Sequence, residues 1–387
     1  MSVSAEIKIL ESDPNSLYKT QRIRFSSDKS IITPTKTIPL DRLKSNHPLN
    51  NNATHLNELF KRFSASQIKE AEEDADKLKL LENHLNRQKN IIKNDKPTYC
   101  FFDFNEARLP TDEETEFLTD LAYCNSDITT IPTISQFKDS KDSTIKYEDY
   151  KKYLESAIES IEQLNHKPIM GVIPRLSRKN TGDLLGFYNN KGINTFALDL
   201  GGSNPISSRT TIFKVLKTLN KMKILDESYI HGHNVGMRVN KITEVIPAKD
   251  VLGFGLGLNS LGEKRTEFKP NRAFISFIQT NPLNKFRLFN KTDYGYWKAI
   301  SSEELEKVYP TDSSIPVSVF KQTFSNPTQY NYIQKAFNFE QLALEAHHIK
   351  EIISEDSEKT LEYITKKKNI APDDVKIIET GQDNIKK

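Results

Sequence analysis

Residues 169–205, IMGVIPRLSRKNTGDLLGFYNNKGINTFALDLGGSNP, decide the fold class that we expect for this chain. Two apolar runs, 167–174 and 193–200, have the pattern of buried strands. The segment between them, 181–192, has the pattern of a helix that ends at Gly192. Strands that are apolar along their whole length and alternate with helices are typical of a parallel sheet covered on both faces. The stretch therefore predicts an α/β fold.

The same alternation continues on both sides of this stretch. Further strands are predicted at TYCFFDF, DITTIPTIS, ESYIHGHNV and KDVLGFGLGL, with a helical segment between each pair. Six such strands in one run, with others supplied by the N-terminal segment, favour a (β/α)8 barrel of the TIM type. A doubly wound open sheet is the alternative, although no G-x-G-x-x-G motif follows the first strand.

Composition divides the chain into four parts. Residues 1–45 contain short β-prone runs, and residues 46–95 are polar and rich in helix formers, which indicates a helical insertion. The main part of the barrel is expected over 96–300. Residues 301–387 are expected to form a C-terminal helical extension and tail, so that the whole C-terminal addition is of the α+β kind.

Charge and cysteine usage limit the class of protein. The formal net charge of +3 does not by itself indicate nucleic-acid binding. No stretch approaches the ~20 apolar residues that span a bilayer, and the first residues lack an apolar signal core. Cys100 and Cys124 are the only cysteines, so neither a disulfide framework nor a cysteine zinc site is available. We therefore expect a cytoplasmic protein without a membrane partner.

Acidic residues and glycines gather where the predicted strands end. In a parallel barrel the functional residues lie on the loops at the carboxyl ends of the strands. Asp103 and Asp199 lie in or after such strands, and a buried carboxylate is costly unless it is paired or used. Gly201 and Gly202 follow directly and would let a ligand approach bare backbone. Asp250 lies beside the last predicted strand.

Two histidines and several basic residues complete the candidate site. His231 and His233 alternate along one strand, so both imidazoles project from the same face. A third metal ligand is not evident, and hydrogen bonding within the barrel is the favoured interpretation, so neither a metal nor a cofactor is expected. Basic clusters flank the strand ends and favour contacts with phosphates, at Arg175, Arg178, Lys264 and Arg265.

These segments together resemble the tRNA-guanine transglycosylase superfamily, which includes the queuine and archaeosine tRNA-ribosyltransferases. Residues 169–205 resemble the family stretch that runs from a G-[IV]-[VI]-Q-G-G strand end through a helix to G-[FY]-A-[IL]-G-G-L. Residues 228–265 have the layout of the family's YLMGVGTPEDILEAV and PTRNGR segments. Residues 22–40 are similar to its GxIxTPxFxPV opening, and residues 337–352 to its late HNLxFxxxLxxxIR helix.

The resemblance implies a barrel enzyme that exchanges guanine in a nucleic acid for a 7-deazaguanine. Asp103 would act as acid and base, and Asp250 would be the nucleophile that forms a covalent glycosyl-aspartate. The target base would have to leave its stack to be reached. The base-binding residues would be Asp199, Gly201, Gly202, His231 and His233, and the nucleic-acid contacts would be Arg175, Arg178, Lys264 and Arg265.

Departures from the family pattern keep several alternatives open. The family's cysteine zinc site is absent, and its Gln-Gly-Gly is Pro174-Arg175-Leu176 here, which indicates a divergent member. The substrate is either tRNA or DNA. The chain is alternatively a catalytically inactive barrel that binds nucleic acid or a partner subunit. A third hypothesis is an unrelated barrel enzyme that cradles a small phosphorylated substrate in GFGLG. A homodimer or a heterodimer is left open.

Overall fold

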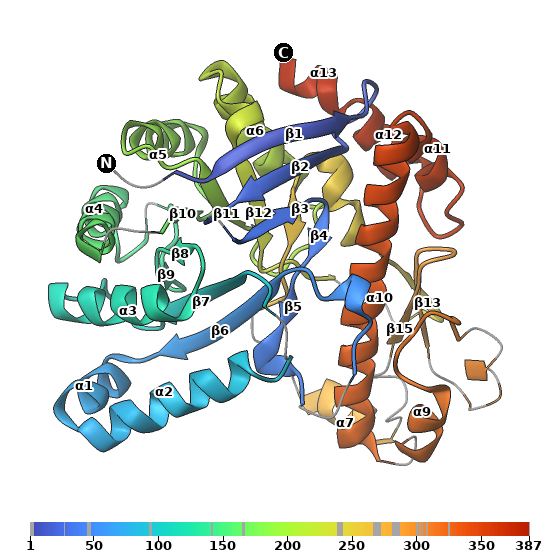
Figure 1. Cartoon of the computed structure of the whole chain (residues 1–387), viewed down its shortest axis with the longest axis horizontal. Helices are drawn as coiled ribbons and strands as arrows, with labels where there is room; N and C mark the ends of the chain where they lie inside the picture. Colours follow the sequence, from blue (N-terminus) through green and yellow to red (C-terminus); the bar gives the residue numbers. More distant parts are fainter. Residues whose placement is uncertain are drawn as a thin grey trace.

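The computed structural model of the chain describes residues 4–26, 28–44, 48–92, 95–140, 142–164, 167–237, 243–265, 272–280, 287–298, 301, 303, 305–306, 309–323 and 326–386. Parallel strands fill its centre, and helices surround them (Figure 1). The α/β class predicted from the alternating strands and helices is confirmed.

Two parallel sheets carry the central strands. The first has the order β4-β14-β12-β11-β10-β8, and the second has the order β5-β6-β7-β9. Their strands are nearly all buried, which explains the continuous apolar runs in the sequence. They are β4 (Thr35–Lys36), β5 (Ile38–Pro39), β6 (Asn57–Phe63), β7 (Thr98–Phe104), β8 (Thr129–Thr130), β9 (Thr133–Ile134), β10 (Ile169–Ile173), β11 (Thr195–Asp199), β12 (Tyr229–His233) and β14 (Ser260–Leu261).

Helices connect these strands and flank the sheets. Most of them begin after a strand, one directly follows another helix, and several start with a side-chain cap: Ser64 and Thr111 both form capping boxes, and Ser177 accepts a hydrogen bond from the Asn180 N–H. Ser64 directly follows its strand, whereas longer segments precede Thr111 and Ser177, so the loops at these carboxyl ends differ in length. The helices are α1 (Ala65–Glu73), α2 (Ala75–Lys89), α3 (Asp112–Asn125), α4 (Tyr147–Leu164), α5 (Arg178–Asn190) and α6 (Arg209–Lys221).

A small antiparallel sheet covers the amino ends of the strands. It is made of β1 (Glu6–Ser12), β2 (Lys19–Arg24) and β3 (Ser30–Ile32). The Asn194 side chain, just before β11, donates to the Ala5 carbonyl oxygen at 2.9 Å. The Gln21 side chain donates to the Asp226 carbonyl oxygen, just before β12, at 3.3 Å. The carboxyl ends on the opposite side carry the predicted site residues.

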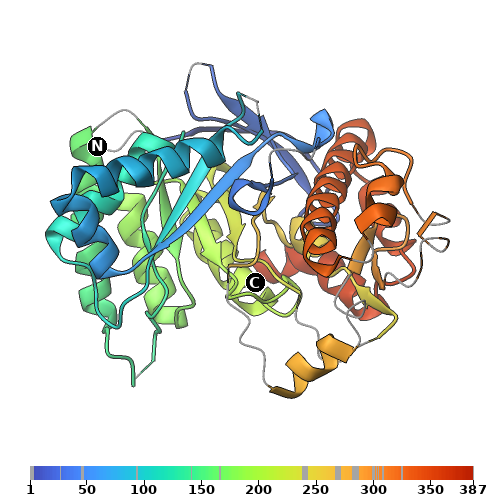
Figure 2. The same ribbon diagram turned by 90° about the horizontal axis from the view of Figure 1, so that it is seen from below.

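The C-terminal part packs beside β4 and β5. Its longest element is α10 (Pro327–Asp356), which runs alongside the central strands in both views (Figures 1 and 2). A second hydrophobic cluster, with Phe320, Tyr330 and Phe337, lies between α10 and its neighbours. The other elements are β13 (Val245–Pro247), β15 (Arg287–Asn290), β16 (Gly295–Lys298), α7 (Arg272–Thr280), α9 (Val317–Thr323), α11 (Lys359–Thr365), α12 (Pro372–Glu379) and α13 (Gly381–Lys386). No helix in the described ranges is both long enough and apolar enough to span a bilayer.

Two of the longer predicted segments differ from the structure, and so does the helix expected just before KDVLGFGLGL, where Val245–Pro247 forms the strand β13. The stretch 46–95 is not purely helical, because Asn57–Phe63 forms β6 and pairs with β7 along its whole length. The stretch KDVLGFGLGL is not a strand. It forms the 3-10 helix η4 (Val251–Leu256), and the last strand, β14, comes after it. The glycines explain the second difference, since Gly257 has φ +87° and ends η4 in the left-handed conformation.

Candidate active site

The carboxyl ends of the strands surround one open pocket of about 700 Å³. Six of the residues predicted from the sequence line it together: Asp103, Arg175, Asp199, Gly201, His233 and Arg265. They come from β7, β11 and β12 and from the segments after β10, β11 and β14. We call this hollow the strand-end pocket. Its other walls include the aromatic residues Phe60, Phe137 and Tyr150.

Asp103 is buried in this pocket between two donors. Arg62 Nε donates to Asp103 Oδ2 at 2.8 Å, and Thr133 Oγ1 donates to Asp103 Oδ1 at 3.0 Å. Burial raises the pKa of the Asp103 carboxyl, although Arg62 and Thr133 work in the opposite direction. A carboxyl with a raised pKa holds a proton over a wider pH range, so Asp103 is suited to exchange a proton with a ligand.

Asp199 is held in place by the backbone that follows it. Asp199 Oδ1 accepts from the Gly201 N–H at 2.8 Å and from Asn234 Nδ2 at 3.1 Å. Gly201 and Gly202 have φ of +58° and +73°, a region that glycine enters without strain. Two donors on one oxygen fix the carboxylate at the edge of the pocket, and the other oxygen makes neither of these bonds.

The glycine turn also gives Arg175 its place. A Cβ on Gly201 would lie 2.8 Å from Arg175 Cζ, so only glycine lets this guanidinium lie against the turn. Arg175 Nη2 donates to the Leu200 carbonyl oxygen and to Ser203 Oγ, the latter at 3.0 Å. The turn thus presents an arginine beside Asp199, at the position predicted for a phosphate contact.

A buried ion pair forms the floor of the pocket. Arg265 Nη2 lies 2.6 Å from Glu58 Oε1, and Arg265 Nη1 lies 2.7 Å from Asp41 Oδ2. Burial alone would raise the pKa of Glu58, but Arg265, two histidines and Lys36 outweigh it and hold that pKa well below its usual range. Arg265 also lies over the Phe60 ring, 4.8 Å from its centroid. Its charge is therefore largely neutralised inside the protein.

The sequence did not point to Glu58 or Arg62. Both lie on β6, within the segment that was expected to be helical. The signal that could have found them is the run NELFKRF, in which charged residues stand among Leu59, Phe60 and Phe63. A charged residue inside a short β-prone run is the same pattern that identified Asp103.

The two histidines project from one face of β12, as predicted. Both rings pack on Phe101, with centroid distances of 5.4 Å for His231 and 4.2 Å for His233. His233 lines the strand-end pocket, whereas His231 lies deeper, where its Nδ1 is 2.8 Å from Ser260 Oγ. Burial lowers the pKa of His231 to about 3. His231 is therefore neutral at physiological pH and belongs to the core beneath the site.

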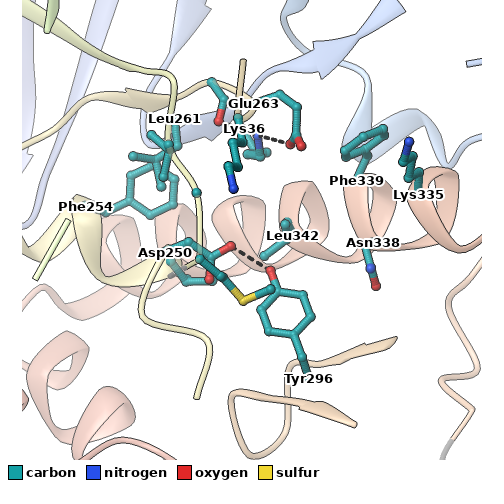
Figure 3. Close-up of a pocket in the computed structure, with 16 residues that line it drawn as sticks. Lys36, Asp250, Phe254, Leu261, Glu263, Tyr296, Lys335, Asn338, Phe339 and Leu342 are labelled. Atoms are coloured by element: carbon teal, nitrogen blue, oxygen red, sulfur yellow. Dashed lines mark hydrogen bonds and ion pairs between the residues drawn. The ribbon is translucent and has the colours of Figure 1, made fainter. Parts of the chain in front are cut away.

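The remaining predicted residues lie elsewhere. Asp250 and Lys264 line a second pocket, formed between the strand ends and α10 (Figure 3). Arg178 lines a surface hollow between α6 and the C-terminal helices. Gly202 does not line the strand-end pocket, and its carbonyl oxygen lies against Gly236. Asp250 is separated from Asp103 because it precedes η4 and does not end a strand.

In the part of the chain that the structure describes, no group of three or more His, Cys, Asp or Glu side chains is arranged so that it could hold a metal ion. The histidine pair is instead explained by ring stacking and by the Ser260 contact.

Neither a known family model nor a curated protein matches this chain. Among solved structures, the chain is similar to the enoyl reductase domain of MlnA from the macrolactin biosynthesis cluster of Bacillus amyloliquefaciens. The similarity covers 86% of this chain and 95% of that chain, at 9% sequence identity and a TM-score of 0.31. A likeness at this level does not place the chain in a family.

Proposed function

We propose that the chain is a nucleobase transglycosylase that exchanges guanine for a 7-deazaguanine in tRNA or DNA. One observation carries this proposal: Asp103 and Asp199, from different strands, line the same pocket. Glycosyl transfer with a covalent intermediate needs two carboxyl groups, one that attacks the sugar and one that handles a proton. The resemblance of the sequence to transglycosylases favours a nucleobase as the leaving group.

We also propose that the two parallel sheets are one closed eight-stranded barrel. In support, only Thr37 separates β4 from β5, and its N–H donates to the Leu261 carbonyl oxygen at 3.0 Å. The next N–H, that of Ile38, donates to the Leu56 carbonyl oxygen at 2.9 Å. At the other junction only two residues separate β8, which pairs with β10, from β9, which pairs with β7. A crystal structure with the strand pairing broken at either junction would contradict this proposal.

The dimensions and lining of the strand-end pocket fit a nucleotide. Its volume of about 700 Å³ lies within the roughly 300–1,000 Å³ of typical ligand sites. Phe60, Phe137 and Tyr150 contribute apolar surface to its wall, where the buried rings of Phe137 and Tyr150 stack on each other. Arg175 lies at the pocket wall, where it can meet a phosphate. An unstacked nucleotide therefore has both an apolar wall and a cation available.

The proposed first step breaks the bond between the sugar and guanine. A carboxylate oxygen of Asp199 attacks the anomeric carbon, and the bond from that carbon to N9 of guanine breaks. The electron pair of that bond leaves with the base, and Asp103, in its protonated form, supplies the proton that neutralises it. The product of this step is a glycosyl ester of Asp199 and free guanine.

The proposed second step reverses these roles with the incoming base. Asp103, now a carboxylate, accepts the proton from N9 of the 7-deazaguanine. That nitrogen attacks the anomeric carbon and displaces the Asp199 carboxylate. We assign the nucleophile to Asp199 and not to Asp250, because Asp199 lies in the same pocket as Asp103 and Asp250 does not.

The exchange assay tests this proposal. Protein is incubated with total tRNA or duplex DNA and a radiolabelled 7-deazaguanine, and the label in the recovered nucleic acid is counted. We expect incorporation by the wild-type protein and none by Asp103→Asn or Asp199→Asn. The matched control is Asp139→Asn, which changes a pocket carboxylate that accepts hydrogen bonds from the Ser177 N–H and the Asn180 side chain. We expect this variant to keep its activity within about tenfold of the wild type.

Two outcomes would overturn the proposal. The first is salt-sensitive binding of the nucleic acid without any incorporation, which would mean an inactive barrel that only binds. The second is neither binding nor incorporation together with stabilisation by a small phosphorylated compound, which would favour the unrelated barrel enzyme.

A further inference from the structure

A second pocket, which we call the helix pocket, lies between the strand ends and α10. Its volume is about 230 Å³, below the roughly 300–1,000 Å³ typical of drug-sized ligands. Phe254, Leu261 and Leu342 give it apolar walls. Figure 3 shows that its polar groups come from segments far apart in the sequence, among them Lys36, Asp250 and Tyr296. Its size suits one small ring system and excludes a whole nucleotide.

Asp250 contributes a buried carboxylate that is only half satisfied. Tyr296 Oη donates to Asp250 Oδ2 at 2.6 Å. The second oxygen, Oδ1, is buried and has no hydrogen-bond partner among the described residues. Burial raises the pKa of this carboxyl, although the Tyr296 hydrogen bond opposes that effect. A buried acceptor without a donor costs about 1–3 kcal/mol, so the pocket favours a ligand that brings an N–H.

Lys36 contributes a buried ammonium on the facing wall. Within the described ranges its Nζ contacts the Gly262 carbonyl oxygen at 2.8 Å and the Glu263 carboxylate at 3.7 Å, and it forms no ion pair with Asp250. An ammonium has three N–H groups, so these contacts leave donor capacity. The Lys36 side chain points toward Asp250 in Figure 3. The Lys36 ammonium and the Asp250 carboxyl group therefore lie on facing sides of the helix pocket.

We propose that the helix pocket binds a free planar heterocycle with a lactam edge, that is, a ring N–H beside a ring carbonyl. The lactam N–H would donate to Asp250 Oδ1, and the Lys36 ammonium would donate to the lactam carbonyl oxygen. The ring faces would pack against Phe254 and Leu342. This pairing satisfies both polar groups with one uncharged ligand.

The proposal does not rest on the exchange reaction. The helix pocket and the strand-end pocket have no lining residue in common. They adjoin along the chain, because Lys264 lines the first and Arg265 the second. A heterocycle in the helix pocket would therefore lie near the strand-end pocket without occupying it.

Calorimetric titration with hypoxanthine, a bicyclic lactam, tests this site. We expect the wild-type protein to bind it with a Kd of millimolar or tighter, and to bind purine, which lacks the lactam, at least about tenfold more weakly. Asp250→Asn should weaken hypoxanthine binding by about 10–100-fold, because it replaces a charged acceptor. Asp103→Asn, in the other pocket, should leave the Kd unchanged.

A second variant covers the case in which Asp250→Asn does not fold. Leu342→Phe adds a ring to the α10 wall of the helix pocket and should abolish binding by filling it. Three results would overturn the proposal: no binding of hypoxanthine by the wild-type protein up to its solubility limit, equal binding of purine, or binding that survives Leu342→Phe. Loss of binding in Asp103→Asn alone would place the base in the strand-end pocket and also overturn it. None of these results bears on whether Asp103 and Asp199 catalyse exchange.

Discussion

Asp103 and Asp250 are two buried carboxyls at the same end of the molecule, but their surroundings differ. Asp103 has an arginine and a threonine as donors, in an open pocket with a second aspartate. Asp250 has one tyrosine as donor, in a small pocket beside α10, and one of its oxygens is unsatisfied. Burial raises the pKa of both. A raised pKa is therefore common to both sites, whereas the neighbouring groups determine the chemistry that each carboxyl can support.

The largest expected difference between the two sites is in the rate of base exchange. Asp199→Asn removes the proposed nucleophile and should reduce the single-turnover rate by at least about 10³-fold, and Asp103→Asn should reduce it by about 10²–10⁴-fold. Asp250→Asn should change that rate by less than about tenfold. The rates are measured with saturating nucleic acid and labelled base. Equal losses in Asp199→Asn and Asp250→Asn would break the distinction between the two pockets.

The floor of the strand-end pocket should be the more costly place to remove a charge. Among the described residues, Glu58→Gln leaves the buried Arg265 with Asp41 as its ion-pair partner, and we expect the free energy of unfolding to fall by about 3–5 kcal/mol. The matched variant in the helix pocket is Glu263→Gln, whose carboxylate is 3.7 Å from Lys36 and partly exposed. It should cost less than about 1 kcal/mol. Urea denaturation measures the free energy of unfolding of both variants. A smaller loss in Glu58→Gln than in Glu263→Gln would refute the role given to Glu58.

Acid should weaken the core beneath the strand-end pocket. The pKa of His231 is about 3 in the folded state, below its unfolded value, so the unfolded chain binds this proton first as the pH falls. The contribution of His231 is therefore complete above about pH 6.5 and is lost toward pH 3, by up to about 1.4 kcal/mol per pH unit.

The variant His231→Gln should flatten this dependence. Urea denaturation between pH 7 and pH 4 measures the slope, and His348→Gln, which changes a half-exposed histidine on α10, serves as the control. If the wild-type protein and His231→Gln have the same slope, the histidine is not the group that titrates.

The smallest expected difference is in the hydrogen bonds of the two acids. Tyr296→Phe removes the donor to Asp250 Oδ2 and should lower the free energy of unfolding by about 1–3 kcal/mol. Thr133→Val removes one donor to Asp103, and Arg62 remains, so we expect a loss below about 1 kcal/mol. Thermal and urea unfolding measure the loss of stability in both variants. A larger loss in Thr133→Val than in Tyr296→Phe would contradict the described surroundings of the two acids.

Much of the fold could be predicted because parallel strands are apolar along their length. The strands at 98–104, 169–173, 195–199 and 229–233 lie inside segments that were expected to be strands. The strand at 57–63 was missed because its charged residues gave it the composition of the helical segment around it. The last strand was predicted about ten residues before β14, because a glycine-rich apolar run is compatible with both a strand and a 3-10 helix.

The candidate site was most predictable where a residue lies at the carboxyl end of a strand or within two residues after it. Asp103, Asp199 and Gly201 meet that condition, and they share one pocket. Asp250 does not meet this condition. It lies at the amino end of η4, and the strand β14 comes only after η4. Whether Glu58 and Arg62 reach the site depends on which strands lie next to one another. Local sequence patterns do not indicate the order of the strands in a sheet.

The central claim is that Asp199, and not Asp250, carries the sugar during exchange. The most direct measurement is to quench the wild-type protein with labelled nucleic acid during turnover, digest it with nuclease and protease, and find the modified peptide by mass spectrometry. We expect a glycosyl group on Asp199, the aspartate of the peptide FALDLGGSNP, residues 196–205. A glycosyl group on Asp250, or nucleic acid recovered without any covalent adduct under conditions of exchange, would contradict it.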